Sequence, residues 1–296
     1  MRSLVKPERT TQTWQWRDQT INYQEAGPTT GLPLVLVHGF GASVGHWRQN
    51  IPVLAEAGYR VFALDLLGFG ASDKPNLEYS LELWQELLAD FWSEKIQRPA
   101  VWAGNSIGAL LCLMMAAYHP EQVSGAVLLN CAGGLNHRPE ELNLPLRVIM
   151  GTFSKVVSAP VLGRFVFDNV RRKFQIRRTL YQVYGDRKAV TDELVDLLYE
   201  PSNDPGALEV FASVLTAPPG PKPTDLLPKI DSPLLVLWGE ADPWTPIKGA
   251  DIYRDLAEQS GQVEFEAIPG AGHCPHDENP AWVNQRIVTW LAATFS

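Results

Sequence analysis

Five short apolar runs, separated by segments of helical periodicity, place the strongest constraint on how this 296-residue chain can fold. Short, continuous apolar runs are typical of strands that are buried on both faces of a sheet. Residues 47–57, 81–96 and 107–119 carry apolar side chains at three- and four-residue spacing, as amphipathic helices do. The alternation predicts an α/β fold with a mostly parallel central sheet flanked by helices. The five runs are residues 34–37, 61–64, 100–103, 127–129 and 234–238.

The two ends of the predicted sheet are also visible in the sequence. Residues 14–16 and 20–24 alternate between apolar and polar side chains around a turn at 17–19, which predicts an opening β-hairpin. Residues 263–268 are the last expected strand, and their two glutamates alternate toward solvent, as suits an edge. A helix over residues 280–293 is expected to close the chain.

The alternation of strands and helices breaks between residues 134 and 229. This segment of about a hundred residues has helical character and becomes proline-rich at 217–223. The whole chain is long enough to bury one large core and to carry an insertion. We therefore predict a core made of residues 1–133 and 230–296, with a helical lid inserted at 134–229.

Composition excludes several classes of protein. The chain is 45% hydrophobic and 20% charged, which is typical of a packed globular protein. Its formal net charge of -8 offers no basic surface for nucleic acid. No apolar stretch approaches the roughly 20 residues of a membrane span, and the polar first 13 residues match neither a signal nor a transit peptide. The three widely spaced cysteines look like reduced thiols, so we expect a cytoplasmic protein.

Ser106 is the candidate nucleophile. It is the centre of the sequence Gly-Asn-Ser-Ile-Gly at 104–108, which follows an apolar strand and opens an apolar helix. A nucleophilic serine at such a strand-to-helix turn needs glycines on both sides, because side chains there would block the turn. A glycine-rich turn with a capping serine is the structural alternative.

A serine hydroxyl needs a base to accept its proton and a third group to orient that base. His273 follows the last predicted strand and is the preferred base, with His276 as its competitor. Asp242 follows the strand at 234–238 and gives the chain order Ser, Asp, His. Glu240 could replace it, whereas Asn130 cannot carry the negative charge that stabilises an imidazolium.

The loop at 38–41 follows the strand at 34–37 and is expected to complete an oxyanion hole. The predicted donors are the backbone N–H groups of Phe40 and Ile107, the latter at the positive end of a helix. His38 is expected to be structural, and the chemistry requires no metal and no cofactor. The candidate pocket residues are Gly39, Gly41, His46, Trp47, Asn105 and Trp244.

A basic cluster within the predicted lid has two interpretations. It consists of Arg171, Arg172, Lys173, Arg177 and Arg178. Such a cluster is commonly the solvated face of a helix, but it could also meet anionic lipid headgroups in a transient contact with a membrane surface.

With Ser106, Asp242 and His273 assigned, the sequence resembles the α/β-hydrolase superfamily over nearly its whole length. Residues 272–278, the turn at 241–244 and residues 211–218 are also similar to pheophytinase-type, chlorophyll-dephytylating serine hydrolases. The resemblance implies hydrolysis of the phytyl ester of pheophytin or chlorophyll, next to photosynthetic membranes. The plant members carry a transit peptide, so this chain looks more like a cyanobacterial relative.

The sequence thus predicts a serine hydrolase that cleaves a long apolar carboxylic ester through an acyl-enzyme. Carbon–carbon bond hydrolysis or a perhydrolase reaction at the same site are alternatives, as is a non-catalytic binding protein of the same fold. Epoxide hydrolases and haloalkane dehalogenases are disfavoured, because they have an aspartate where Ser106 stands. The expected partner is a small apolar ester, and the oligomeric state is left open.

Overall fold

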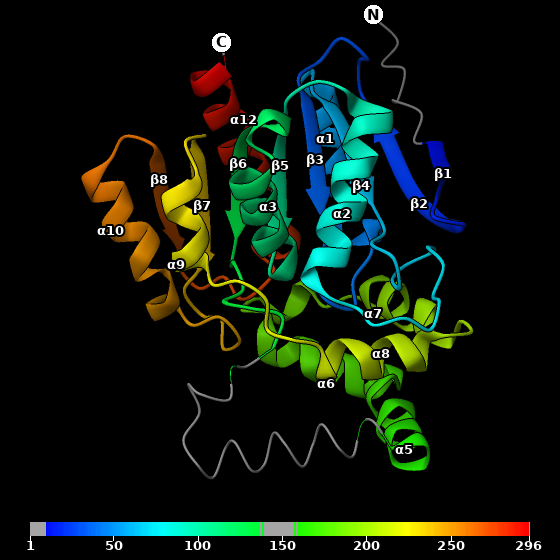
Figure 1. The fold of residues 1–296 in the computed structure, drawn as a ribbon. Coiled ribbons are helices and arrows are strands. Elements are labelled where there is room, and N and C mark those ends of the chain that lie inside the picture. Colours follow the sequence, from blue (N-terminus) through cyan, green and yellow to red (C-terminus); the bar gives the residue numbers. More distant parts are fainter. Residues whose placement is uncertain (1–9, 137, 139–156, 158, 296) are drawn as a thin grey trace, which may run out of the picture.

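The computed structural model describes residues 10–136, 138, 157 and 159–295, and these form one sheet with helices on both faces (Figure 1). Part of the predicted lid, at 137, 139–156 and 158, lies outside the described residues. The sheet has eight strands. They are β1 (Thr10–Trp16), β2 (Gln19–Ala26), β3 (Pro33–Val37), β4 (Arg60–Leu64), β5 (Ala100–Asn105), β6 (Val123–Leu129), β7 (Leu234–Gly239) and β8 (Val263–Ile268).

The strands lie in the order β1-β2-β4-β3-β5-β6-β7-β8. The opening hairpin pairs antiparallel, β2 continues antiparallel onto β4, and every later pair is parallel. The α/β fold class, the hairpin and all the predicted buried strands are therefore confirmed. β8 is an edge strand, as predicted, and its two glutamates, Glu264 and Glu266, both bind Arg286 of the last helix.

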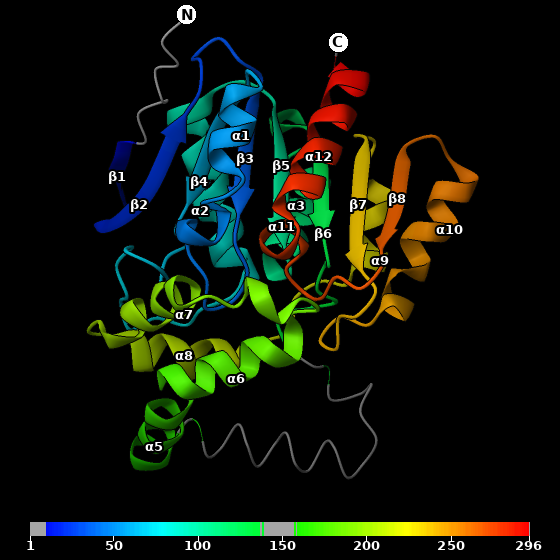
Figure 2. The same ribbon diagram turned by 180° about the vertical axis from the view of Figure 1, so that it is seen from behind.

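Helices cover the two faces of the sheet in separate layers. α2, α3, α9 and α10 lie on one face, whereas α1 and α12 lie on the other (Figures 1 and 2). The helices of these layers are α1 (Ile51–Glu56), α2 (Leu81–Phe91), α3 (Ile107–Tyr118), α9 (Pro223–Leu226), α10 (Asp251–Gln259) and α12 (Pro280–Phe295).

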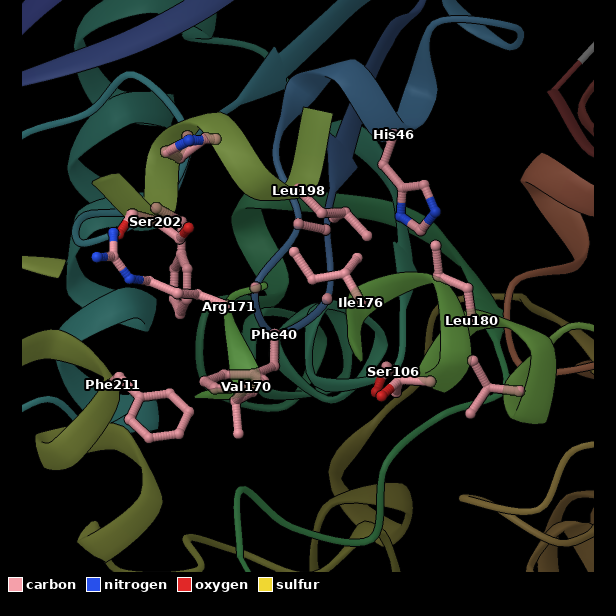
Figure 3. A pocket seen from close by; sticks show the side chains of 18 of the residues that line it. Phe40, His46, Ser106, Val170, Arg171, Ile176, Leu180, Leu198, Ser202 and Phe211 are labelled. Atoms are coloured by element: carbon pink, nitrogen blue, oxygen red, sulfur yellow. The ribbon is translucent and has the colours of Figure 1, made fainter. Parts of the chain in front are cut away.

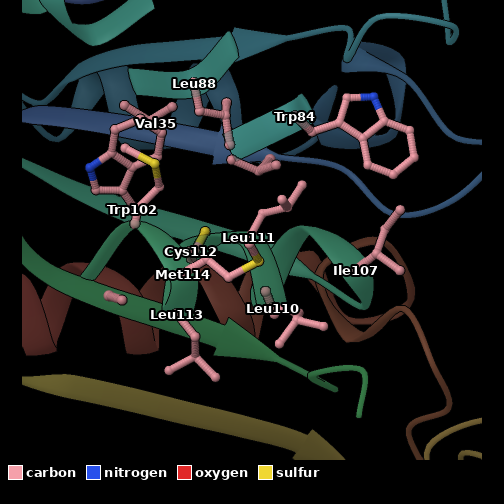
Figure 4. Close-up of a cluster of buried hydrophobic side chains, with 14 of the residues drawn as sticks. Val35, Trp84, Leu88, Trp102, Ile107, Leu110, Leu111, Cys112, Leu113 and Met114 are labelled. Carbon is pink, nitrogen blue, oxygen red and sulfur yellow. The ribbon is translucent and has the colours of Figure 1, made fainter. Parts of the chain in front are cut away.

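The core of the molecule surrounds α3, which is apolar on all sides. Residues 107–116 of this helix are all buried between the sheet and α2. Figure 4 shows its side chains against Trp102 of β5 and against Trp84 and Leu88 of α2. Because burial of each large apolar side chain contributes about 1.5–3 kcal/mol, α3 is a rigid support for the residue that precedes it, Ser106.

Two predicted helices differ from the observed ones. In place of a helix over 47–57 there is a 3₁₀ turn, Val44–Trp47, and then α1, which begins at Ile51. Pro52 is in the first turn of α1, where its missing N–H costs nothing. The helix predicted over 81–96 is α2 followed by a π-helical turn, which ends where Gln97 adopts a left-handed φ of 58°.

Four helices between β6 and β7 lie across the carboxyl ends of the parallel strands (Figures 1 and 2). They are α5 (Pro160–Val170), α6 (Lys173–Val183), α7 (Asp192–Tyr199) and α8 (Ala207–Thr216). α9, which follows them, packs instead against α3 on the face of the sheet. We therefore propose that the lid ends before Pro223 rather than at residue 229. Of the described helices, none combines the length and apolar character that crossing a membrane requires.

Candidate active site

Ser106 occupies a sharp turn between β5 and α3. Its φ of 58° and ψ of -121° are rare for a residue with a side chain. A Cβ atom at Gly108 would lie 2.2 Å from the Val37 carbonyl oxygen, and one at Gly104 would lie 2.3 Å from the Gly108 backbone. Only glycine fits at these two close approaches. The turn therefore has the geometry of a nucleophile elbow.

His273 and Asp242 meet at the same edge of the sheet. His273 is in the loop after β8, and Asp242 is in the loop after the neighbouring β7. Nδ1 of His273 lies 2.6 Å from Oδ2 of Asp242, and both side chains are buried. This carboxylate fixes the imidazole tautomer with hydrogen on Nδ1, which leaves Nε2 free to accept a proton.

Three further groups hold the Asp242 carboxylate. The backbone N–H of Trp244 donates to Oδ1 at 2.7 Å, the Asn130 amide donates to Oδ2 at 2.7 Å, and the Thr245 hydroxyl also donates to Oδ2. Burial raises the pKa of Asp242, but the hydrogen bonds from His273, Thr245 and Trp244 outweigh burial and lower the pKa overall. The aspartate therefore stays ionised beside the histidine.

The backbone and ring of His273 are also held in place. Its N–H donates to the carbonyl of Val183 at the end of α6, at 2.8 Å. Its carbonyl accepts from the Asn105 side chain at 2.8 Å. The ring of Trp244 packs against the imidazole with centroids 5.2 Å apart. This hydrogen bond from Asn105, the residue before Ser106, therefore connects the end of β5 with the loop that carries His273.

Ser106 and His273 both line a cavity of about 290 Å³ between the sheet edge and the helices α5 to α8, which we call the main cavity because more residues line it than line the second one. Figure 3 shows Phe40, His46 and Ser106 around this space together with Ile176 and Leu180 of α6 and Phe211 of α8. Its two cations are already paired, Arg171 with Asp168 and Lys74 with Asp204. Most of the wall is apolar and comprises Phe40, Phe69, Phe167, Val170, Ile176, Leu180, Val183, Leu198, Val210 and Phe211.

A second cavity, of about 440 Å³, begins at the same point. It shares Phe40, Ser106, Trp244 and His273 with the main cavity. Its other walls come from the chain after β6, from α8 and from the loop that carries Asp242. Ser106 therefore lines both cavities.

The two predicted oxyanion donors lie next to Ser106. Ile107 is the first residue of α3, so its backbone N–H has no acceptor within the helix. Phe40 is in a tight turn in which the Ala42 N–H donates to the Gly39 carbonyl, and Gly41 supplies the required positive φ of 70°. Phe40 lines both cavities, while Ile107 lines the second.

Five of the six candidate pocket residues, namely Gly39, Gly41, His46, Asn105 and Trp244, line the main cavity. The prediction for Trp47 is wrong. Its side chain is fully buried and stacks on His276, with ring centroids 4.2 Å apart. The 3₁₀ turn explains the difference, since it directs His46 toward the cavity and its neighbour into the core.

His46 belongs to a buried polar chain that the sequence did not reveal. Its Nε2 lies 2.8 Å from the Tyr184 hydroxyl, which donates to Asp277 at 2.9 Å. Arg48 binds the other oxygen of Asp277 at 2.7 Å. Burial lowers the pKa of His46 to about 4. Tyr184 directly follows α6, whereas His46, Arg48 and Asp277 lie outside the segment between β6 and β7, so these hydrogen bonds join that segment to the rest of the molecule.

The competing residues have other roles. His276 is fully buried, and neither of its ring nitrogens has a hydrogen-bond partner among the described residues. Glu240 is exposed. His38 is structural, as predicted, because its Nε2 accepts from the backbone of Leu66 inside the core. In the described part of the chain no group of three or more His, Cys, Asp or Glu side chains could hold a metal.

Comparison with known proteins identifies the family. The sequence profile of the α/β-hydrolase fold family matches residues 33–280, and the chain belongs to that family. The superfamily predicted from the serine, aspartate and histidine motifs is thereby confirmed.

The chain is 27% identical to chloroplastic pheophytinase of Arabidopsis thaliana over 320 residues, which covers 94% of this chain but only 65% of the plant protein. It is 31% identical to the 2-hydroxy-6-oxo-2,4-heptadienoate hydrolase of Pseudomonas putida over 257 residues, or 83% of each chain. Among solved structures, a membrane phospholipase A is similar with a TM-score of 0.76 and 27% identity, over 97% of this chain and 86% of that one. All three relatives are hydrolases by name.

Proposed function

We propose that the protein is a serine hydrolase of long apolar carboxylic esters, with Ser106 as nucleophile, His273 as base and Asp242 as the group that orients the base. One observation carries the proposal. A strained serine at the end of β5 lines the same cavity as an imidazole that is bonded, at 2.6 Å, to a buried carboxylate. This is the set of groups that activates a hydroxyl for acyl transfer.

In the first half of the reaction, Oγ of Ser106 attacks the ester carbonyl carbon while Nε2 of His273 takes the hydroxyl proton. The carbonyl oxygen becomes an anion, which the N–H groups of Phe40 and Ile107 stabilise. When the tetrahedral intermediate collapses, the bond to the alcohol oxygen breaks. His273 then gives its proton to the leaving alcohol, and the acyl group remains on Ser106.

In the second half, water takes the place of the alcohol. His273 removes a proton from water as the hydroxide attacks the acyl carbon, and the bond to Ser106 breaks on collapse. The proton returns to Oγ of Ser106, and the carboxylic acid leaves. Asp242 keeps its negative charge throughout and stabilises the imidazolium in both halves.

The two cavities support an ester with two bulky parts. They meet at Ser106, so one can hold the acyl part and the other the alcohol part. The cations of the main cavity are paired with carboxylates, and this favours an uncharged chain over an anion there. With the likeness to pheophytinase, these features favour the phytyl ester of a chlorophyll-type pigment as substrate.

The nucleophile is tested by labelling with a fluorophosphonate, which reacts with activated serines. We expect one adduct on Ser106, and a loss of several orders of magnitude in ester hydrolysis for Ser106→Ala. Ser202→Ala is the matched control, because this serine lines the same cavity but its hydroxyl donates to the carbonyl of Tyr199 rather than lying beside a histidine that is bonded to a carboxylate. Labelling of Ser202, or no adduct on folded protein, contradicts the proposal.

The substrate class needs a separate assay. Incubation with pheophytin, with chlorophyll and with nitrophenyl esters of increasing chain length is expected to release phytol from a pigment and to favour the longer esters. Carbon–carbon bond hydrolysis is the second candidate, because the relative from Pseudomonas putida is a hydrolase of a dienoate. Faster turnover of a vinylogous diketone than of any ester would support that reaction instead.

A further inference from the structure

The outer surface of α5 and α6 carries exposed apolar side chains among basic ones. Of the eleven exposed large hydrophobic side chains in the described residues, six lie within residues 160–183. Single exposed apolar residues are normal on a protein surface, but their concentration in two short helices is not. Five of them belong to the outer faces, namely Val161, Leu162, Phe165, Phe174 and Tyr181, whereas the sixth, Val170, borders the main cavity at the end of α5.

On α5 the exposed residues form one face. Val161, Leu162 and Phe165 are spaced to lie together, and Phe165 is 73% exposed. The opposite face carries Phe167, which is buried against Phe211 of α8, with ring centroids 5.2 Å apart. The helix is therefore apolar on both sides, and only the inner side is used by the fold.

On α6 the same division recurs. Leu180 and Val183 are buried on the inner face of α6, while Phe174, Arg178 and Tyr181 share its outer face at four- and three-residue spacing. Phe174 is 73% exposed. In Figures 1 and 2, α5 lies on the far side of α6 from the sheet, so both helices are at the end of the molecule remote from the core.

The charge of these helices is opposite to that of the rest of the chain. Residues 160–183 contain six basic residues and one acidic residue, a formal net charge of +5, whereas the whole chain carries -8. Lys173 and Arg177 are paired with aspartates of α7. Arg172 and Arg178 are exposed, and neither forms a salt bridge within the part of the chain that the structure describes.

We propose that the outer faces of α5 and α6 dock on an anionic membrane surface. Phenylalanine and aliphatic side chains interleaved with arginines are the composition of a helix that lies in a lipid headgroup region. Anionic headgroups complement the exposed Arg172 and Arg178, and the acyl region below the headgroups receives the aromatic rings. The proposal does not depend on the catalytic roles, because docking requires neither Ser106 nor a substrate.

The same two helices connect this surface with the main cavity. Val170 at the end of α5, Arg171 directly after it, and Ile176, Leu180 and Val183 of α6 line that cavity. Docking would therefore bring the lid that covers Ser106 into direct contact with lipid. An apolar ester dissolved in the membrane would then be separated from Ser106 only by these helices.

The test is binding of the full chain to vesicles in the absence of substrate. Sedimentation with vesicles of phosphatidylglycerol and phosphatidylcholine is compared with pure phosphatidylcholine vesicles. We expect binding to the anionic vesicles that weakens as salt is raised, because salt screens the headgroup charge. Ser106→Ala is expected to bind like the wild type, so failure of docking and failure of the proposed hydrolysis are distinguishable.

Two double variants separate the apolar and basic contributions. Arg172→Glu with Arg178→Glu, and Phe165→Ser with Phe174→Ser, should each weaken binding by about tenfold or more. The controls are Lys248→Glu, which changes an exposed charge, and Leu77→Ser, which changes an exposed apolar side chain. Both residues lie on the surface outside α5 and α6. Unchanged melting temperatures verify that the variants fold.

Three outcomes overturn the proposal. The first is no binding to anionic vesicles, and the second is equal binding to neutral ones. The third is a wild-type protein that forms a dimer and does not bind vesicles, and that the double change Phe165→Ser with Phe174→Ser converts to a monomer. That result would assign the surface to contact between copies of the chain.

Discussion

Asp242 is the residue on which the orientation of His273 depends. Its two oxygens accept from His273, Thr245, Asn130 and the Trp244 N–H. Both oxygens accept hydrogen bonds. An asparagine at this position would replace one oxygen with an NH₂ group, and that NH₂ group would face at least one of the present donors without an acceptor between them.

Asp242→Asn is therefore expected to lower kcat by about 10⁴-fold while the protein remains folded, because the imidazole then takes the wrong tautomer. Hydrolysis of a nitrophenyl ester and the melting temperature are the measurements. Glu240→Gln is the control, since Glu240 is exposed two residues earlier. If Glu240→Gln lost activity and Asp242→Asn kept it, the orienting acid would be Glu240.

The sequence placed Ser106, Asp242 and His273 at one edge of the sheet because each stands at or shortly after the end of a recognisable strand. Ser106 has glycines at fixed spacing, and Asp242 and His273 come after the last two parallel strands. The residues that support them have no such signal. The contact of Thr245 with Asp242 depends on the shape of the turn after Asp242, which the sequence does not specify. The prediction for Trp47 is wrong because the 3₁₀ turn at Val44–Trp47 decides which of two neighbouring side chains faces the cavity.

At the scale of elements, α11 (Pro275–Glu278) connects the lid with the loop of His273. One carboxylate, that of Glu278, accepts from the backbone N–H groups of Gly185 and Asp186 in the lid and of Gly272 and Cys274 on either side of the histidine. Burial raises the pKa of Glu278, although these four N–H groups act to lower it.

Glu278→Ala leaves those backbone groups without their acceptor, at a cost of about 1–3 kcal/mol for each donor that water cannot reach. We expect a lower kcat with a smaller change in KM, and faster hydrogen exchange at 183–186 and 271–274. Glu258→Ala, an exposed glutamate on α10, is the control. Unchanged exchange in both segments would show that the lid and the loop are held by other contacts.

Strands were easier to predict than helices for a physical reason. A strand buried on both faces is a continuous apolar run, and all five such runs proved to be strands. The helix boundaries depended on Pro52 and on the left-handed Gln97, which periodicity does not register. The position of α9 against α3 is a matter of packing and could not be deduced from composition.

For the whole molecule, buried histidines predict loss of stability in mild acid. The pKa of His46 is about 4 in the folded protein, against 6.5 for an ordinary histidine. Between these values the unfolded chain binds a proton that the folded chain does not. The free energy of unfolding is therefore complete above pH 6.5 and falls by about 3 kcal/mol as the pH decreases to 4. Burial lowers the pKa of His276 as well, with the same sign.

Melting temperatures measured from pH 7 to pH 4 check this expectation. His46→Gln should have a shallower decline than the wild type, whatever its stability at pH 7. His119→Gln is the control, because His119 is partly exposed at the end of α3. Parallel curves for the wild type and His46→Gln would exclude His46 as the source of the acid sensitivity.

The hydrogen bond from the His273 N–H to the Val183 carbonyl has a consequence for how a long molecule reaches the serine. Val183 ends α6, so raising this end of α6 would break the hydrogen bond and disturb the loop that carries His273. We therefore propose that a long substrate enters at the other end of α6, beside α5, where this hydrogen bond stays intact.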